Sequence, residues 1–261
     1  MKSAVSRVLV AVSVVAALGS TAACGGSGDD DGKQAAKPGA SKGANDPKDG
    51  GGSGAAAKLE KAALASGDVK GYKVEKADKA TPRPAGATSP AGCAPLAAVL
   101  GPGTPPKADA HAGRYLSSSS DEDATGVDVG LSAYKPDGAE KVMDDLNAAL
   151  KSKKCATFGV GGDRYIGVRA VTAPGKGDET VSYKLAHREG KFMMREGVTV
   201  VRSGGTLMVF KASNLYDPES VQDDREAERN GMKGAGAPTA DEDPKVAPAI
   251  VDAQVAKLRQ L

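Results

Sequence analysis

The fold is decided by the stretch Gly197-Val-Thr-Val-Val-Arg-Ser-Gly-Gly-Thr-Leu-Met-Val-Phe-Lys211. Its two halves, 197–202 and 206–211, are rich in the β-branched and large apolar residues that favour strands. Ser203-Gly-Gly205 joins them, and glycine supplies the positive φ angle that a tight hairpin turn requires. The stretch therefore predicts an antiparallel hairpin, around which the remaining segments are arranged.

Outward from this hairpin, the chain contains further strands and helices. Apolar and polar residues alternate from Val127 to Ala133, which predicts a half-buried strand. Other strands are expected at 71–75, 114–119, 165–171 and 180–187, and helices at 55–66, 93–100, 139–150 and 244–261. Residues 214–243 are polar, acidic and rich in Gly and Pro, which predicts a long surface loop. The sum is one α+β domain over residues 55–261, with helices packed on one face of an antiparallel sheet.

The N-terminus has the layout of a signal peptide. Two basic residues precede an apolar run at 8–18, which is too short to span a bilayer, and small residues follow it. The string Thr21-Ala-Ala-Cys24 resembles the lipobox of bacterial lipoproteins, with Thr where Leu is usual. We expect residues 1–23 to be removed and Cys24 to carry a thioether-linked diacylglycerol. The alternative is an ordinary secretory cut near Ala23 that leaves Cys24 as a free thiol.

The segment after Cys24 has the composition of a linker. Residues 25–54 contain no aromatic residue and no aliphatic residue larger than Ala. Such a segment cannot bury enough surface to offset its chain entropy, so it is expected to be disordered. Residues 24–54 would then form a tether with a root-mean-square reach of about 30 Å. Two acyl chains suffice for stable anchoring, so the expected location is the extracytoplasmic face of the cell membrane.

Charge and cysteine count narrow the partners. Without Lys2 and Arg7 the net charge falls from +2 to zero, so we expect no nucleic-acid partner. Cys93 and Cys155 are then the remaining pair, and in an oxidising compartment they predict a disulfide. It would close a loop of about 60 residues and stabilise the fold by about 4 kcal/mol. A metal pair or a catalytic thiol is the alternative, but two Cys with two distant His lack a metal spacing. No metal and no cofactor are expected.

Catalytic motifs are weak in this chain. Ser132-Ala-Tyr-Lys135 matches the Ser-x-x-Lys spacing of penicillin-binding enzymes, in which both side chains share one helical turn. Here the alternation places them on a strand and facing opposite ways, so we interpret the match as chance. His187 is expected to be a structural residue at a strand end, and His111 to lie in a solvated loop. No order of Ser, His and Asp supports a hydrolase triad.

Three other patterns fall short of a ligand site. Residues 121–126 resemble the start of a calcium loop, but the twelfth position is Ser132 in place of a bidentate Glu. Gly159-Val-Gly-Gly162 lacks the third glycine and the following helix of a nucleotide loop. The acidic stretch 217–228 is interpreted as a solvated surface, with binding of a basic partner as the alternative. Its acidic residues are Asp217, Glu219, Asp223, Asp224, Glu226 and Glu228.

Four pieces of the chain together resemble a known kind of domain. They are Gly67-Asp-Val-Lys-Gly-Tyr-Lys-Val74, Cys93-Ala-Pro-Leu96, the amphipathic helix that ends at Cys155, and the hairpin 198–210. Over residues 65–215 the chain resembles actinobacterial lipoproteins with an extracellular sensor-type domain, like the outer domain of certain membrane serine/threonine kinases. The resemblance implies an α+β sheet with a central cleft, and sensing of a ligand or partner outside the cell. Those domains usually carry two disulfides, whereas one pair is present here, and the resemblance assigns no binding residue.

The expected function is therefore that of a non-enzymatic, lipid-anchored extracytoplasmic protein. It would bind a small molecule, a cell-wall component or another envelope protein. The alternative is a carrier that holds a lipid or glycolipid between the sheet and its helices, which requires a continuous apolar cavity. A third hypothesis is an envelope hydrolase, which requires a clustered nucleophile and base, with His187 and Ser132 as the residues to test.

Overall fold

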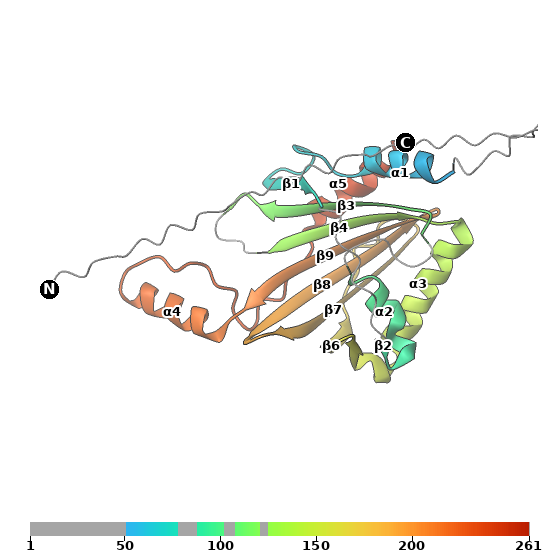
Figure 1. Ribbon diagram of the computed structural model, residues 1–261. Helices are drawn as coiled ribbons and strands as arrows, with labels where there is room; N and C mark the ends of the chain where they lie inside the picture. The colour runs from blue at the N-terminus through green and yellow to red at the C-terminus, as the bar shows by residue number, and fades with distance from the viewer. Residues whose placement is uncertain (1–50, 78–87, 102–107, 121–124, 261) are drawn as a thin grey trace, which may run out of the picture. The chain divides into compact units, whose positions relative to one another are not determined.

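The computed structural model describes residues 51–77, 88–101, 108–120 and 125–260 (Figure 1). Within these ranges nine strands form one antiparallel sheet in the order β1-β3-β4-β9-β8-β7-β6-β5-β2. The strands are β1 (Tyr72–Lys76), β2 (Thr88–Ser89), β3 (Ala110–Ser118), β4 (Gly126–Ala133), β5 (Thr157–Val160), β6 (Asp163–Ala170), β7 (Glu179–Glu189), β8 (Phe192–Ser203) and β9 (Thr206–Tyr216). The helices are α1 (Gly51–Ala62), α2 (Ala94–Ala98), α3 (Pro136–Lys151), α4 (Pro218–Arg229) and α5 (Pro248–Leu258), with short 3₁₀ helices η1 (Ala91–Cys93) and η2 (Lys153–Ala156). In the same ranges, none of the helices has the length and apolar composition that crossing a membrane requires.

The hairpin of β8 and β9 confirms the predicted turn and lies in the middle of the sheet. Both strands extend beyond the predicted halves, as far as Met193 and Tyr216. Gly204 has a φ angle of 57°, a left-handed conformation that favours glycine. A Cβ atom at Gly205 would collide with the carbonyl oxygen of Tyr134, so the second turn position requires glycine for a different reason.

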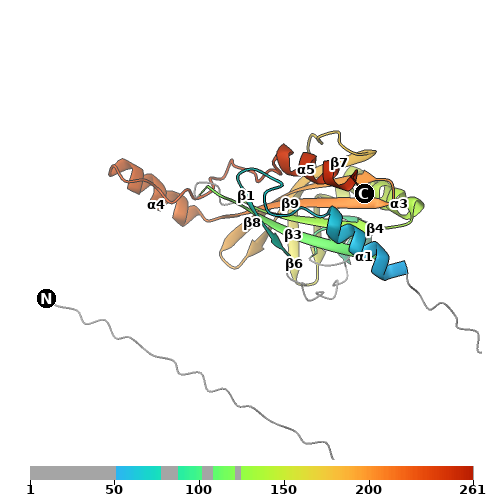
Figure 2. The ribbon, with the colours of Figure 1, turned by 90° about the horizontal axis from the view of Figure 1, so that it is seen from above.

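Neighbouring residues of the central strands face opposite sides of the sheet, as the pleat requires. Val201 and Met208 belong to a core with α1 and α5, whereas Val200 and Leu207 belong to a second core with α2 and α3. We call these sides the α5 face and the α3 face (Figures 1 and 2). The predicted α+β class is confirmed. Helices cover both faces rather than one, because β8 and β9 carry apolar side chains on both sides.

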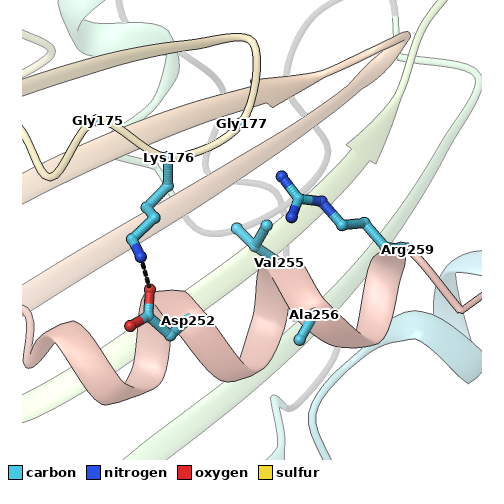
Figure 3. A pocket seen from close by; sticks show the side chains of 7 residues that line it. All are labelled: Gly175, Lys176, Gly177, Asp252, Val255, Ala256 and Arg259. Atoms are coloured by element: carbon cyan, nitrogen blue, oxygen red, sulfur yellow. Dashed lines mark ion pairs between the residues drawn. The ribbon is translucent and has the colours of Figure 1, made fainter.

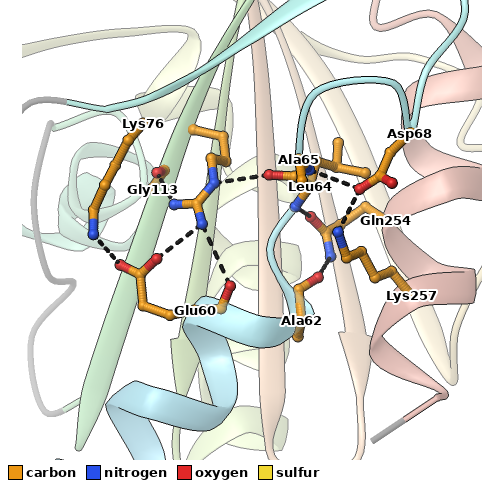
Figure 4. A network of polar contacts seen from close by, with 10 residues as sticks. Glu60, Ala62, Leu64, Ala65, Asp68, Lys76, Gly113, Gln254 and Lys257 are labelled. Carbon is orange, nitrogen blue, oxygen red and sulfur yellow. Dashed lines mark hydrogen bonds and ion pairs between the residues drawn. The ribbon is translucent and has the colours of Figure 1, made fainter.

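A buried set of polar contacts ties α1 to α5 and β3 on the α5 face (Figure 4). Arg114 of β3 donates its Nε to the Leu64 carbonyl and its Nη2 to Glu60 Oε2, both at 2.8 Å. Gln254 of α5 donates to the Ala62 carbonyl at 2.7 Å and accepts from the Leu64 N–H at 3.2 Å. These side chains satisfy backbone groups at and just beyond the end of α1, where no further helical turn can bond them. We call this set the α1–α5 joint.

The predicted disulfide between Cys93 and Cys155 is confirmed. It joins η1 to η2, with the two Cα atoms 5.5 Å apart, and both cysteines are buried in the core of the α3 face. Helix α2 follows directly after Cys93, and η2 follows α3. The bridge therefore fastens α2 to the end of α3.

Several boundaries differ from the predictions. Helix α1 begins at Gly51, so residues 51–54 belong to a helix and not to the tether. Helix α4 replaces part of the predicted loop 214–243, because Asp217 caps its N-terminus and accepts a hydrogen bond from the Glu219 N–H. Strands β2 and β5 are short and paired with each other, and neither was expected from local alternation.

Candidate functional site

A row of charged side chains crosses the α3 face from β4 to β8. Lys211 of β9 lies in its middle, with Nζ 3.5 Å from Asp128 Oδ2 on β4 and 3.8 Å from Glu196 Oε1 on β8. Asp128 is the direct partner of Lys211 in the β4–β9 ladder, and Glu196 is its diagonal neighbour on β8. We call Asp128, Lys211 and Glu196 the charged row.

Exposure falls steadily along the charged row. The side chain of Asp128 is 50% exposed, that of Lys211 18% and that of Glu196 6%. The row therefore leads from solvent at Asp128 to a buried carboxylate at Glu196. Burying a carboxylate costs free energy unless it is paired and hydrogen-bonded, so the position of Glu196 needs a reason beyond packing.

Three polar atoms gather at the buried end of the row. Glu196 Oε2, Tyr183 Oη and His187 Nδ1 are buried and have no hydrogen-bond partner in the part of the chain that the structure describes. Tyr183 and His187 flank Leu185 on β7, and Leu185 is the direct partner of Glu196 on β8. We call Glu196, Tyr183 and His187 the Glu196 cluster. Buried polar atoms without partners are uncommon in folded proteins, so three in neighbouring positions indicate a site.

Aromatic rings border the Glu196 cluster. Phe158 of β5 stacks on Tyr165 of β6 with ring centroids 5.1 Å apart, and Tyr165 contacts the ring of His187 at 4.9 Å. His187 lies near the end of β7, as predicted. The expectation that it is a satisfied structural residue is wrong, because its Nδ1 atom is buried without a partner among the described residues.

Burial changes the acidity of this cluster. It raises the pKa of the Glu196 carboxyl, and the nearby Lys211 and His187 offset this only in part. Burial also raises the pKa of the Tyr183 hydroxyl well above its ordinary value, and the Glu196 carboxylate acts in the same direction. Perturbed titratable groups gathered on one face are typical of functional sites.

Helix α2 connects the charged row to the disulfide. Lys211 Nζ donates to the carbonyl of Leu100, just beyond the end of α2, at 3.2 Å. Since Cys93 immediately precedes α2, the bridge to Cys155 positions the segment that holds Lys211. The site is thus a set of fixed charges and acceptors, an arrangement suited to recognition of a polar group.

His111 and Ser132 form a separate pair on the α3 face. They are direct partners in the β3–β4 ladder, and His111 Nδ1 is 3.0 Å from Ser132 Oγ. The predicted loop position of His111 is wrong, because residues 110–118 form strand β3; burial lowers the pKa of its imidazole. Ser132 is 1% exposed, and Lys135 lies beyond β4 at the N-cap of α3. The pair is a cross-strand hydrogen bond and not an accessible nucleophile with its base.

The remaining predicted residues do not enlarge this site. Cys24 and residues 121–124 lie outside the described residues. Gly161 and Gly162 form the turn between β5 and β6. The acidic stretch 217–228 lies mostly on α4, which projects from the sheet (Figures 1 and 2). Within the described ranges, no group of three or more His, Cys, Asp or Glu side chains could hold a metal ion.

A cavity of about 250 Å³ lies beside α5, away from the charged row (Figure 3). It is lined by the loop around Lys176 and by α5. Lys176 Nζ is 2.7 Å from Asp252 Oδ1, and the Arg259 side chain extends near Val255. None of the buried unpartnered atoms belongs to its lining. For this reason we place the candidate site at the charged row.

The sequence analysis missed the residues of the charged row. Glu196 left a trace, because in Glu196-Gly-Val198-Thr-Val200 it stands in phase with two valines that face the core. A charge in an inward-facing phase breaks the local rule, and such breaks are expected at functional positions. Asp128 and Lys211 left no trace, because polar residues normally alternate with apolar ones on a half-buried strand.

Comparisons with known proteins yield two weak structural likenesses. No family model matches the chain, and no curated protein is significantly similar to it. The extracellular domain of PknH from Mycobacterium tuberculosis is similar with a TM-score of 0.45 at 10% identity, over 79% of this chain and 97% of that one. An Rv0999 ortholog from Mycobacterium smegmatis is similar with a TM-score of 0.39 at 15% identity, over 78% and 95%. Both scores lie below 0.5, so neither likeness carries a conclusion about location or function.

Proposed function

We propose that the chain is a lipid-anchored extracytoplasmic binding protein without catalytic activity, and that its ligand site is the charged row with the Glu196 cluster. The buried Glu196 carboxylate carries this proposal, because Oε2 has no partner among the described residues. A ligand group that bonds this oxygen would remove the cost of leaving it buried and unpaired. The graded exposure from Asp128 inward supplies the route to it.

The proposed location rests on the N-terminal sequence. Residues 1–23 have the layout of a signal peptide, and Cys24 follows small residues at the expected cut. The tether is shortened to residues 24–50, because α1 begins at Gly51. Replacing Cys24 with Ala should move the mature chain from the membrane fraction to the soluble fraction.

The residues available for catalysis support a binding role. A hydrolase built on Ser132 would need access to its hydroxyl, which is closed from solvent. His187 cannot serve as its base, because β9 and β8 separate the strand of His187 from that of Ser132. Neither residue that the hydrolase hypothesis requires is therefore placed for that reaction.

The cavity beside α5 gives the lipid-carrier alternative no support. Its volume is about 250 Å³, whereas ligand pockets usually begin at about 300 Å³. Its lining includes Lys176, Asp252 and Arg259, which are charged and unsuited to an acyl chain. A polar ligand at the charged row is the better-supported function.

Native mass spectrometry of the mature full-length protein tests the proposed site. We expect a co-purifying ligand mass in the wild type and its loss in the Glu196→Gln variant. Glu226→Gln, on the exposed surface of α4, is the matched control and should retain the ligand. A ligand that remains bound to Glu196→Gln would place the binding site elsewhere, and an acyl-chain mass would favour the carrier.

A further inference from the structure

The charge of the site indicates what kind of ligand group Glu196 receives, a step that rests on the proposed function. The charged row contains two carboxylates, Asp128 and Glu196, and one ammonium, Lys211. Lys211 Nζ lies closer to Asp128 than to Glu196, at 3.5 Å against 3.8 Å, and it also donates to the Leu100 carbonyl. Glu196 is therefore only partly neutralised, and the row retains one negative charge.

The hydrogen-bonding capacity of the Glu196 cluster points the same way. A carboxylate oxygen only accepts hydrogen bonds, and the Tyr183 oxygen and an unprotonated His187 Nδ1 can also accept them. The three atoms occupy neighbouring positions on β7 and β8. A primary ammonium group carries one positive charge and three N–H donors, so it matches both the charge and the acceptors. An anionic group would instead face the unpaired Glu196 oxygen.

We infer that the site binds the primary ammonium group of a small amine or of a peptide amino terminus, with Glu196 as its counter-ion. The group enters at Asp128, the half-exposed end of the row, and reaches Glu196 at the buried end. Lys211 remains with Asp128 and the Leu100 carbonyl, while the ligand ammonium pairs with Glu196. The ligand thus completes an ion pair that the chain leaves unfinished.

Isothermal titration calorimetry with methylammonium chloride tests this inference on the mature full-length protein. Ethylene glycol and tetramethylammonium are the matched probes, since the first lacks the charge and the second lacks the N–H donors. We expect methylammonium to bind and neither matched probe to compete with it. The Glu196→Gln variant should bind methylammonium about tenfold more weakly, since a hydrogen bond to a charged group is lost. Glu226→Gln should bind like the wild type.

Each other outcome overturns the ammonium assignment. Competition by ethylene glycol would indicate a neutral hydroxyl ligand, and equal binding of tetramethylammonium would indicate a cation site without hydrogen bonds. Methylammonium binding that persists in Glu196→Gln would place the amine elsewhere, provided that a melting curve shows the variant to be folded. If no probe binds, the ammonium assignment fails, whereas a co-purifying mass that depends on Glu196 would still support the proposed function.

Discussion

The α1–α5 joint and the Glu196 cluster both place polar groups against apolar cores, but they differ in how those groups are satisfied. In the joint, the Arg114 guanidinium bonds a carboxylate and backbone carbonyls, and the Gln254 amide uses both its oxygen and its nitrogen. In the cluster, three buried atoms have no partner among the described residues. The joint has the properties of a structural contact, and the cluster those of a binding site.

The two faces are also held together by different means. The α5 face joins distant segments by polar contacts, such as the bond from Gln254 to the Ala62 carbonyl. The α3 face joins them by the covalent bridge between Cys93 and Cys155, which are 62 residues apart. Changes in the joint and the bridge should therefore lower stability, whereas a change at Glu196 should act in the opposite direction.

The largest effect is expected from removing the bridge. The Cys93→Ser, Cys155→Ser double variant should lower the free energy of unfolding by about 4 kcal/mol, because the unfolded chain regains the entropy of a long loop. Urea denaturation under non-reducing conditions measures this. Cys24→Ala is the matched control, because Cys24 lies outside the bridge, and it should unfold like the wild type. Equal midpoints for the double variant and the wild type would contradict the stabilising role of the bridge.

A smaller loss is expected in the joint. Gln254→Leu leaves the Ala62 carbonyl and the Leu64 N–H buried without partners, which should lower the free energy of unfolding by about 3 kcal/mol. Gln260→Leu changes an exposed glutamine near the same end of the chain and should cost little. If the two variants unfold at the same urea concentration, the joint does not contribute as argued.

The sequence predicts the central hairpin and the bridge because both depend on local or compositional rules. Ser203-Gly-Gly205 specifies a turn by itself, and Cys93 has one eligible partner once Cys24 is lipidated. The charged row depends on β4 pairing with β9, far apart in sequence, so its members could not be grouped in advance. His111 was misplaced because its strand alternates small residues, Ala110, Ala112 and Gly113, which carry little periodic signal.

The Glu196→Gln variant should gain about 1 kcal/mol of stability at neutral pH, in contrast to both losses. The substitution removes a buried carboxylate that Lys211 pairs only loosely, while Lys211 keeps Asp128. Glu60→Gln is the informative comparison in the joint, because it removes a close partner of Arg114 and should lower stability. Urea midpoints of the two variants measure the difference. A large loss in Glu196→Gln would show that the carboxylate is fully compensated in the folded protein.

The smallest effect, a pH dependence, has opposite signs in the two regions. Burial raises the pKa of Glu196 above its ordinary value of 4.5, so its contribution is favourable below that pH and is lost as pH rises through the folded-state pKa. The Arg114 guanidinium lowers the pKa of Glu60, so that contribution is present above pH 4.5 and is lost as pH falls. Unfolding free energies measured from about pH 3 to about pH 8 should therefore show the Glu196→Gln variant gaining on the wild type as pH rises. The deficit of Glu60→Gln should shrink on acidification. A constant gap between wild type and Glu196→Gln would mean that this carboxyl titrates as if in water, and the buried site would lose its main support.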